Sequence, residues 1–195
     1  MQNALAVVAI ADELAIDDES IKRGLGAFQG IGRRLQRYGE FSVGGHNVTL
    51  VDDYGHHPRE IAATLQAIRA CWPERRLVTV FQPHRFTRTR DLFEDFTQVL
   101  SDLDSLVMLD IYSAGEKPIP GADARSLCRA IRNRGQVDPV FIEHTDQVAG
   151  TLDNLLQDGD LVLTLGAGTV GTIAPALVEY WGAQQLPLAD SGGAQ

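Results

Sequence analysis

Five short runs of consecutive apolar residues, each followed by a segment with helical periodicity, dominate this sequence. The runs are VTLVDD, RLVTVFQ, SLVMLDIY, PVFIE and DLVLTLG, at residues 48–53, 76–82, 105–112, 139–143 and 160–166. Helices are expected after them over 58–71, 91–102, 123–134, 145–156 and 169–181. Strands that are apolar on consecutive positions are typical of a parallel sheet buried on both faces. The sequence therefore predicts an α/β fold, a doubly wound and mostly parallel sheet with helices on both faces.

A different pattern precedes the first apolar run. Residues 3–14 and 19–28 are expected to form two helices, and the glycine-containing segment that follows interrupts their periodicity. We place a linker at residues 29–37 and the start of the α/β domain at residue 38. The tail, residues 183–195, is small and polar, so we expect it to be disordered.

Composition limits the classes of partner. The chain has 195 residues and a formal net charge of −9, which argues against non-specific binding to nucleic acid. No apolar run approaches the roughly eighteen residues of a membrane-spanning helix. Cys71 and Cys128 show neither a CxxC spacing nor a disulfide framework. We therefore expect a protein of the reducing cytoplasm whose partner is a small anion.

The segment QPHRFTRTR, residues 82–90, follows the second apolar run and carries Arg85, Arg88 and Arg90. Ligands of open α/β sheets bind beyond the carboxyl ends of the strands, and a guanidinium group offers donors that match a carboxylate or phosphate. We expect this run at the start of a helix, where cations oppose the helix dipole unless an anion is bound. The run therefore indicates an anion site.

The segment DDYGHHP, residues 52–58, follows the first apolar run and permits three interpretations. Its carboxylates and imidazoles, together with the distant His84, could bind a divalent metal, as in a metal-dependent hydrolase. An acid at a strand end could instead hold the ribose of a nucleotide while a histidine orients a substrate. The third interpretation is structural, with HHP opening the next helix and Pro58 in its first turn.

The segment GAGTVG, residues 166–171, matches the GxGxxG pattern between a strand and a helix. That pattern normally opens a βαβ unit and is followed by an acid, whereas here it comes near the end of the sequence. We expect the glycines to permit close packing or to face a neighbouring domain. A stand-alone dinucleotide-binding module remains an alternative, as does a phosphate at the helix N-terminus.

Taken in order, DDYGHHP, FQPHRFTRTRDLFEDF, YSAGEKPIPGADARSLC and LGAGTVG resemble the C-terminal domain of the Mur ligases, the amino-acid-adding ligases of peptidoglycan synthesis. The resemblance covers residues 1–182 and is strongest to the member that adds L-alanine to UDP-N-acetylmuramate through an acyl phosphate. It implies a Rossmann-like domain over 38–182 and, over 1–37, the helical end and linker of a central ATP-binding domain. No GxxxxGK[ST] sequence occurs in the chain. We therefore expect a fragment that lacks the N-terminal and central domains and is inactive alone.

The resemblance also implies roles for individual residues. ATP and Mg²⁺ serve the complete enzyme, and no metal is expected to be held by this chain. The implied partners are ATP, UDP-N-acetylmuramate and L-alanine. The residues implied to contact the nucleotide are Asn3, Arg34 and Asp53. Those implied to face L-alanine and the acyl phosphate are Tyr54, His56, Arg85 and Arg88, of which His56, Arg85 and Arg88 are the candidate catalytic residues.

Overall fold

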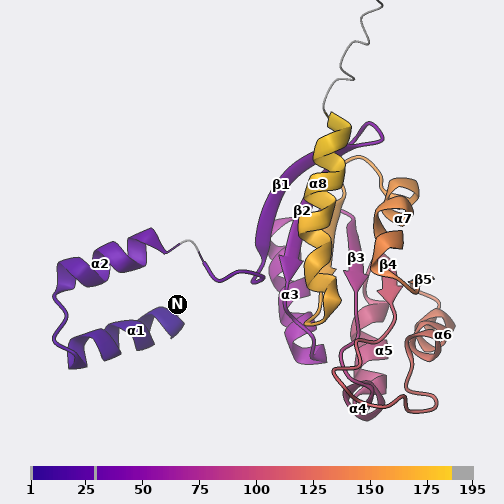
Figure 1. The fold of residues 1–195 in the computed structure, drawn as a ribbon, viewed down its shortest axis with the longest axis horizontal. Helices are drawn as coiled ribbons and strands as arrows, with labels where there is room; N and C mark the ends of the chain where they lie inside the picture. The colour runs from indigo at the N-terminus through magenta and orange to yellow at the C-terminus, as the bar shows by residue number, and fades with distance from the viewer. Residues whose placement is uncertain (1, 29, 186–195) are drawn as a thin grey trace, which may run out of the picture. The chain divides into compact units, whose positions relative to one another are not determined.

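The computed structural model describes the backbone of residues 2–28 and 30–185, and the side chains of residues 4–28 and 30–183. Two compact units divide the chain, Met1–Gly32 and Arg33–Gln195 (Figure 1). The boundary between Gly32 and Arg33 lies within the linker predicted at residues 29–37, before the predicted start of the α/β domain at residue 38. The predicted tail falls mostly on residues 186–195, which lie outside the described residues, and its predicted start at residue 183 is too early because the last helix continues to Gln185.

The first unit contains two helices, α1 (Gln2–Glu13) and α2 (Asp18–Ala27), as the sequence analysis predicted. Asp17 fixes the start of α2, because its carboxylate accepts a hydrogen bond from the backbone N–H of Ser20 at 2.9 Å. An apolar groove is lined by residues of both helices, including Val7, Leu25 and Phe28.

The second unit is built on a six-stranded sheet in the order β1-β2-β6-β3-β4-β5. The strands are β1 (Gln36–Val43), β2 (His46–Asp53), β3 (Leu77–Phe81), β4 (Ser105–Leu109), β5 (Val140–Ile142) and β6 (Leu161–Leu165). All neighbouring pairs are parallel except β1 and β2. The five predicted strands and their parallel arrangement are confirmed.

Helices cover both faces of this sheet (Figure 1). One face packs against α3 (Pro58–Cys71), α5 (Phe93–Ser101) and α6 (Ala124–Arg134) through a core that includes Ile61, Phe96 and Leu127. The other face packs against α7 (Val148–Leu155) and α8 (Ile173–Gln185), with Leu152 and Trp181 buried there. Short 3₁₀ turns, Thr145–Gln147 and Thr169–Thr172, lead into α7 and α8. The doubly wound prediction is therefore confirmed.

Strand β1 was not predicted. It forms an antiparallel hairpin with β2, and the turn contains Gly44 and Gly45, both with positive φ angles, 58° and 88°. Two-residue turns of this kind suit glycine, because both central residues need positive φ. β1 is an edge strand with alternating exposure, so it lacks the apolar run that marked the other strands.

The strand order brings the carboxyl ends of β2, β6 and β3 together. The chain leaves β2 and β3 toward the α3 and α5 face, whereas it leaves β6 toward α8. Adjacent strands whose connections diverge to opposite faces open a crevice at their carboxyl ends, and ligands of such sheets bind there.

Candidate functional site

A row of aromatic and imidazole rings crosses the carboxyl ends of the strands. The ring centroids of Tyr54 and His56 lie 5.3 Å apart, those of His56 and His84 5.6 Å apart, and those of His84 and Tyr112 5.3 Å apart. The rings come from the loops after β2, β3 and β4. The segments DDYGHHP and QPHRFTRTR, which the sequence analysis selected, are therefore joined in one site, and the loop after β4 adds Tyr112 to it.

Arg85 begins the short helix α4 (Phe86–Asp91) in an unusual backbone conformation. Its φ is 74° and its ψ is 135°, a region that non-glycine residues rarely adopt. Its N–H donates to the carbonyl oxygen of Tyr112 at 2.8 Å. The side chain is 51% exposed, and its Nη1 lies 4.0 Å from Oε1 of Glu116. The loop that follows β4 thus holds Arg85 in its strained conformation.

The prediction that the arginines lie at a helix start and so require an anion is wrong for Arg88 and Arg90. The predicted helix 91–102 corresponds to α5, and a separate short helix that was not predicted, α4, precedes it and ends before Leu92. Arg88 and Arg90 therefore lie in the last turn of α4, where a cation is favourable and needs no anion. Arg90 is exposed and pairs with Asp91 at 2.7 Å. Of the three arginines, Arg85 and Arg88 remain in contact with the site.

Arg88 determines the tautomer of His84. Its Nη1 lies 3.2 Å from Nδ1 of His84 and donates to the His84 carbonyl oxygen, also at 3.2 Å. A guanidinium only donates hydrogen bonds, so Nδ1 must accept and the imidazole proton resides on Nε2. Desolvation, followed by the charges of Arg88, His56 and Arg85, lowers the pKa of His84 below its ordinary value. His84 is accordingly a neutral imidazole at neutral pH.

The two histidines of DDYGHHP have different roles. His56 Nδ1 lies 3.1 Å from the Tyr54 carbonyl oxygen and 3.3 Å from Oε2 of Glu60. Both oxygens accept, so Nδ1 carries a proton, and Nε2 is an acceptor whenever the ring is neutral. His57 instead caps α3, accepting from the N–H of Arg59 at 3.3 Å. The structural interpretation is therefore confirmed for His57, and Pro58 is the first residue of the helix.

Asp53 is occupied by internal hydrogen bonds. Its carboxylate accepts from the N–H of Leu35 at 2.9 Å, the N–H of Gly55 at 2.8 Å and the hydroxyl of Thr64 at 3.0 Å. The residue is 4% exposed. A ribose would find little free acceptor capacity there, so the geometry gives Asp53 a structural role in joining the linker to the loop after β2. Its predicted contact with ribose stays a prediction.

The linker contributes two arginines, of which the sequence analysis chose one. Arg34 is exposed, with its Cζ 5.7 Å from the ring centroid of Tyr54. Arg33, which was missed, donates from Nε to buried Asp52 at 2.7 Å and from Nη2 to the Gly166 carbonyl oxygen at 2.6 Å. Arg33 is thus neutralised within the fold, and Arg34 is the linker arginine open to a ligand.

The glycines of GAGTVG serve close packing, as expected. A Cβ atom on Gly168 would lie 2.6 Å from Cβ of Tyr112, and one on Gly171 would lie 2.5 Å from Nη1 of Arg33. Gly166 has a φ of 137°, and its Cβ would lie 2.8 Å from the Gln82 carbonyl oxygen. The pattern is explained by packing within the domain, so it gives no support to a stand-alone dinucleotide-binding module.

Several of the proposed metal ligands are engaged by other groups of the protein. Asp52 binds Arg33 and the hydroxyl of Thr164, the latter at 2.6 Å, and Asp53 and His57 make the contacts given above. Within the described ranges, no three histidine, cysteine or acidic side chains are grouped so that they could hold a metal ion. The structure therefore offers no support for a metal-dependent hydrolase.

Asn3, the remaining residue implied to contact the nucleotide, lies in α1, and its side chain lies outside the described part of the structure.

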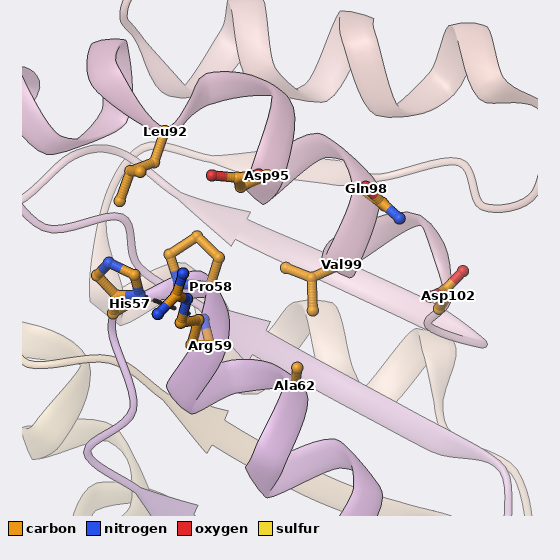
Figure 2. A pocket seen from close by; sticks show the side chains of 9 residues that line it. All are labelled: His57, Pro58, Arg59, Ala62, Leu92, Asp95, Gln98, Val99 and Asp102. Atoms are coloured by element: carbon orange, nitrogen blue, oxygen red, sulfur yellow. Dashed lines mark hydrogen bonds between the residues drawn. The ribbon is translucent and has the colours of Figure 1, made fainter.

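A groove of about 480 Å³ lies between α3 and α5 (Figure 2), with His57 and Arg59 on one side and Asp95 and Gln98 on the other. Its lining includes His57 and Pro58 of DDYGHHP but none of the residues implied to contact the nucleotide, L-alanine or the acyl phosphate, and the ring row lies outside it. No helix within residues 2–28 and 30–185 has the length and apolar character to cross a membrane.

Comparison with known proteins places this chain in a family. The family model described as "Mur ligase, glutamate ligase domain" matches residues 33–168. The UDP-N-acetylmuramate--L-alanine ligase of Methylococcus capsulatus is 57% identical over 185 residues, which are 95% of this chain and 39% of that protein.

Solved structures share the fold. The UDP-N-acetylmuramate-alanine ligase MurC of Thermotoga maritima superposes with a TM-score of 0.70 at 24% identity, over 94% of this chain and 37% of the other. A murein peptide ligase of Psychrobacter arcticus gives a TM-score of 0.61 at 19% identity, over 96% of this chain and 37% of the other. The chain thus spans well under half the length of these relatives. Because the family model covers most of the chain, the protein belongs to the Mur ligase family through its C-terminal domain.

Proposed function

We propose that this chain is the C-terminal domain of an ATP-dependent ligase that joins L-alanine to UDP-N-acetylmuramate in peptidoglycan synthesis. The observation that carries the proposal is the 57% identity over 185 residues to a protein named for that reaction. The aligned 185 residues are 95% of this chain, so the aligned region includes the loops that carry the ring row and the arginines beside it. ATP and a UDP-sugar are cytoplasmic metabolites, so the bacterial cytoplasm is the proposed location.

The chemistry requires cations at this crevice. A carboxylate oxygen of UDP-N-acetylmuramate attacks the γ-phosphorus of ATP, ADP leaves, and an acyl phosphate results. The amine of L-alanine then attacks the acyl carbon, phosphate leaves with the bonding electron pair, and the amine nitrogen loses a proton. Negative charge grows on oxygen in both steps, and preorganised donors that meet this charge lower the barrier.

Arg85 and Arg88 are proposed to meet the anions of the site, Arg88 the oxygen charge of the acyl phosphate and Arg85 chiefly the carboxylate of L-alanine. Arg85 is half exposed and its ion pair with Glu116 is long, so most of its guanidinium donors can reach a ligand. Arg88 lies one helical turn further on, against His84. Tyr54 and His56 border the same space, and the Nε2 acceptor of His56 is suited to hydrogen-bond the substrate amine.

The nucleotide is proposed to contact the linker side of the crevice. Arg34 is the exposed cation there, beside the Tyr54 ring, and it fits a phosphate. Asp53 fits a ribose less well because of its three internal donors, and we propose that it mainly fixes the linker. Asn3 is retained as a proposed contact to adenine from the first unit.

Other parts of the complete enzyme are proposed to supply what this chain lacks. Mg²⁺ has no three-ligand group among the described side chains, so its binding is assigned to the central domain. Residues 1–37 are proposed to be the end of that domain and its linker. Exposed apolar side chains on α1 and α2, such as Leu5, Ile10 and Leu25, support this assignment, because a larger domain would bury them.

Expression of the complete reading frame that contains this chain tests the proposal. Phosphate release from ATP should require both UDP-N-acetylmuramate and L-alanine, and the product should contain one new amide bond by mass spectrometry. The 195-residue chain should show no turnover under the same conditions. Release that ignores L-alanine, or that proceeds equally well with D-glutamate, would assign another substrate.

A further inference from the structure

Glu116, in the loop after β4, reaches back to the start of α4. Its Oε2 accepts from the backbone N–H of Thr87 at 2.9 Å, and its Oε1 accepts from the hydroxyl of Thr87 at 2.7 Å. The same Oε1 is the atom that lies 4.0 Å from Nη1 of Arg85. One carboxylate therefore joins the helix start to the guanidinium group of the strained arginine.

The backbone of the same loop is also joined to the arginine run. The N–H of Tyr112 donates to the Pro83 carbonyl oxygen at 2.9 Å, and the Tyr112 carbonyl oxygen accepts from Arg85. The pair His84 and Tyr112 forms an isolated parallel bridge with stacked rings. The loop therefore fixes Arg85 from two directions, through Tyr112 on the backbone and through Glu116 on the side chain.

Glu116 carries its charge at neutral pH. Hydrogen bonds from Thr87, first from its backbone and then from its side chain, hold the pKa of Glu116 below its ordinary value, and the Arg85 charge adds to this effect. Glu116 is 22% exposed on its side chain, against 51% for Arg85. A largely covered carboxylate thus restrains a more open guanidinium, which keeps free donors for a second carboxylate.

We propose that Glu116 is a positioning residue of the amino-acid subsite, holding Arg85 in the orientation that receives the carboxylate of the amino-acid substrate. This inference rests on the proposed function. Glu116 acts through Arg85 and touches no reacting atom. A carboxylate that only capped α4 would affect folding and would leave the discrimination between substrates unchanged.

Glu116→Gln separates these two roles. Glutamine can still accept from the Thr87 N–H and donate to its hydroxyl, so the cap is preserved and only the charge facing Arg85 is lost. Glu94→Gln is the matched control, because Glu94 pairs with Arg134 at 2.7 Å on an exposed surface. The kinetic experiment uses the complete enzyme with two amines, L-alanine and L-alaninamide, of which only the first has a carboxylate.

With Glu116→Gln the KM for L-alanine should rise about tenfold, as expected for loss of a binding contact, while the KM for ATP stays within about twofold. The kcat/KM for L-alaninamide should not change, and Glu94→Gln should resemble wild type throughout. Arg85→Ala combined with Glu116→Gln should be no worse than Arg85→Ala alone, because coupled residues are not additive. An equal loss for both amines, or additive losses in the double variant, would overturn the proposal.

A second measurement needs no turnover. In the 195-residue chain, the ¹⁵N heteronuclear NOE of Arg85 Nε should show an ordered side chain in wild type and a mobile one in Glu116→Gln. Unchanged order in the variant would overturn the proposal. If the complete wild-type enzyme instead fails to release phosphate with L-alanine, the proposed function and the named substrate fail, and the NMR result still decides whether Glu116 orders Arg85.

Discussion

Arg85 should reverse the usual ranking of alanine and glycine. Its φ of 74° and ψ of 135° lie in a region that costs a residue with a Cβ about 1–3 kcal/mol. Glycine escapes this cost but loses about 0.5–1 kcal/mol of chain entropy on folding. Arg85→Gly should therefore be more stable than Arg85→Ala by about 1 kcal/mol, after these two effects are set against each other.

Arg90 supplies the control within the same run. It lies inside α4 with an exposed side chain, so alanine should exceed glycine there by about 0.5–1 kcal/mol. Each comparison is between two variants that have both lost the arginine, so the loss of the guanidinium cancels. The sign of the difference between glycine and alanine should thus be opposite at the two positions.

Urea unfolding followed by tryptophan fluorescence measures both differences. The two tryptophans, Trp72 and Trp181, lie in the second unit, so the signal reports the domain that contains Arg85. With a urea m-value of about 1–3 kcal/mol per molar, the midpoints at residue 85 should differ by roughly 0.3–1 M. If Arg85→Ala unfolds at the same or a higher urea concentration than Arg85→Gly, the strained conformation is refuted, and with it the restraint assigned to the loop after β4.

Three further predictions concern buried groups. Thr79 has a buried hydroxyl with no hydrogen-bond partner within the described residues, so Thr79→Val should stabilise the fold by about 1 kcal/mol. Thr164→Val is the control, because it loses a 2.6 Å hydrogen bond to a buried carboxylate. This control variant should be less stable than wild type in the same urea assay. Burial raises the pKa of the Cys128 thiol to about 11, so in native protein at pH 8 a thiol reagent should label it far more slowly than the exposed cysteine, and equally fast only in denaturant. An NMR titration should place the pKa of His84 below 6.5 and show that this pKa rises in Arg88→Ala. In the wild-type protein the unfolded chain binds the His84 proton more readily than the folded chain does. The free energy of unfolding should therefore fall as the pH drops through 6.5 toward the folded-state pKa of His84.

The sequence was sufficient for the parallel core because each of its strands is apolar on both faces. Val51, Leu163 and Phe81 lie on neighbouring strands with side chains that are fully buried. Such runs are typical of a parallel sheet covered on both faces, and parallel pairing then brings the loops that follow them to one edge. The meeting of His56 with His84 follows from that topology, although the two are far apart in the sequence.

Local exceptions were less predictable, for different physical reasons. Strand β1 alternates in exposure at the edge of the sheet, and only its Gly44 and Gly45 turn could have revealed the hairpin. The short helix α4 was not predicted, and it has neither a side-chain cap at its start nor a proline or glycine at its end that would mark it in the sequence. Arg85 was placed correctly at a strand end, but its positive φ depends on hydrogen bonding to Tyr112, which the sequence does not show.

The choice between Arg33 and Arg34 shows how the fold creates a positive site in a chain of net charge −9. Asp52 and Asp53 are consecutive in β2, and consecutive strand residues face opposite sides of a sheet. Asp52 takes up the charge of Arg33, while Asp53 is saturated by neutral donors. Neither acid remains to oppose Arg34.

On the other side of the crevice, Arg85 and Arg88 are also open to a ligand. Glu116 lies beside Arg85 at the long distance of 4.0 Å, and Arg88 contacts a histidine that its own charge helps to keep neutral. Among the described side chains, no carboxylate oxygen lies within ion-pair distance of Arg34 or Arg88. Asp52 and Asp53 are thus directed inward, and Arg34 and Arg88 remain available to an anionic ligand. A ligand that carries phosphates and a carboxylate would complete this charge balance, which is the composition that the proposed reaction brings to the crevice.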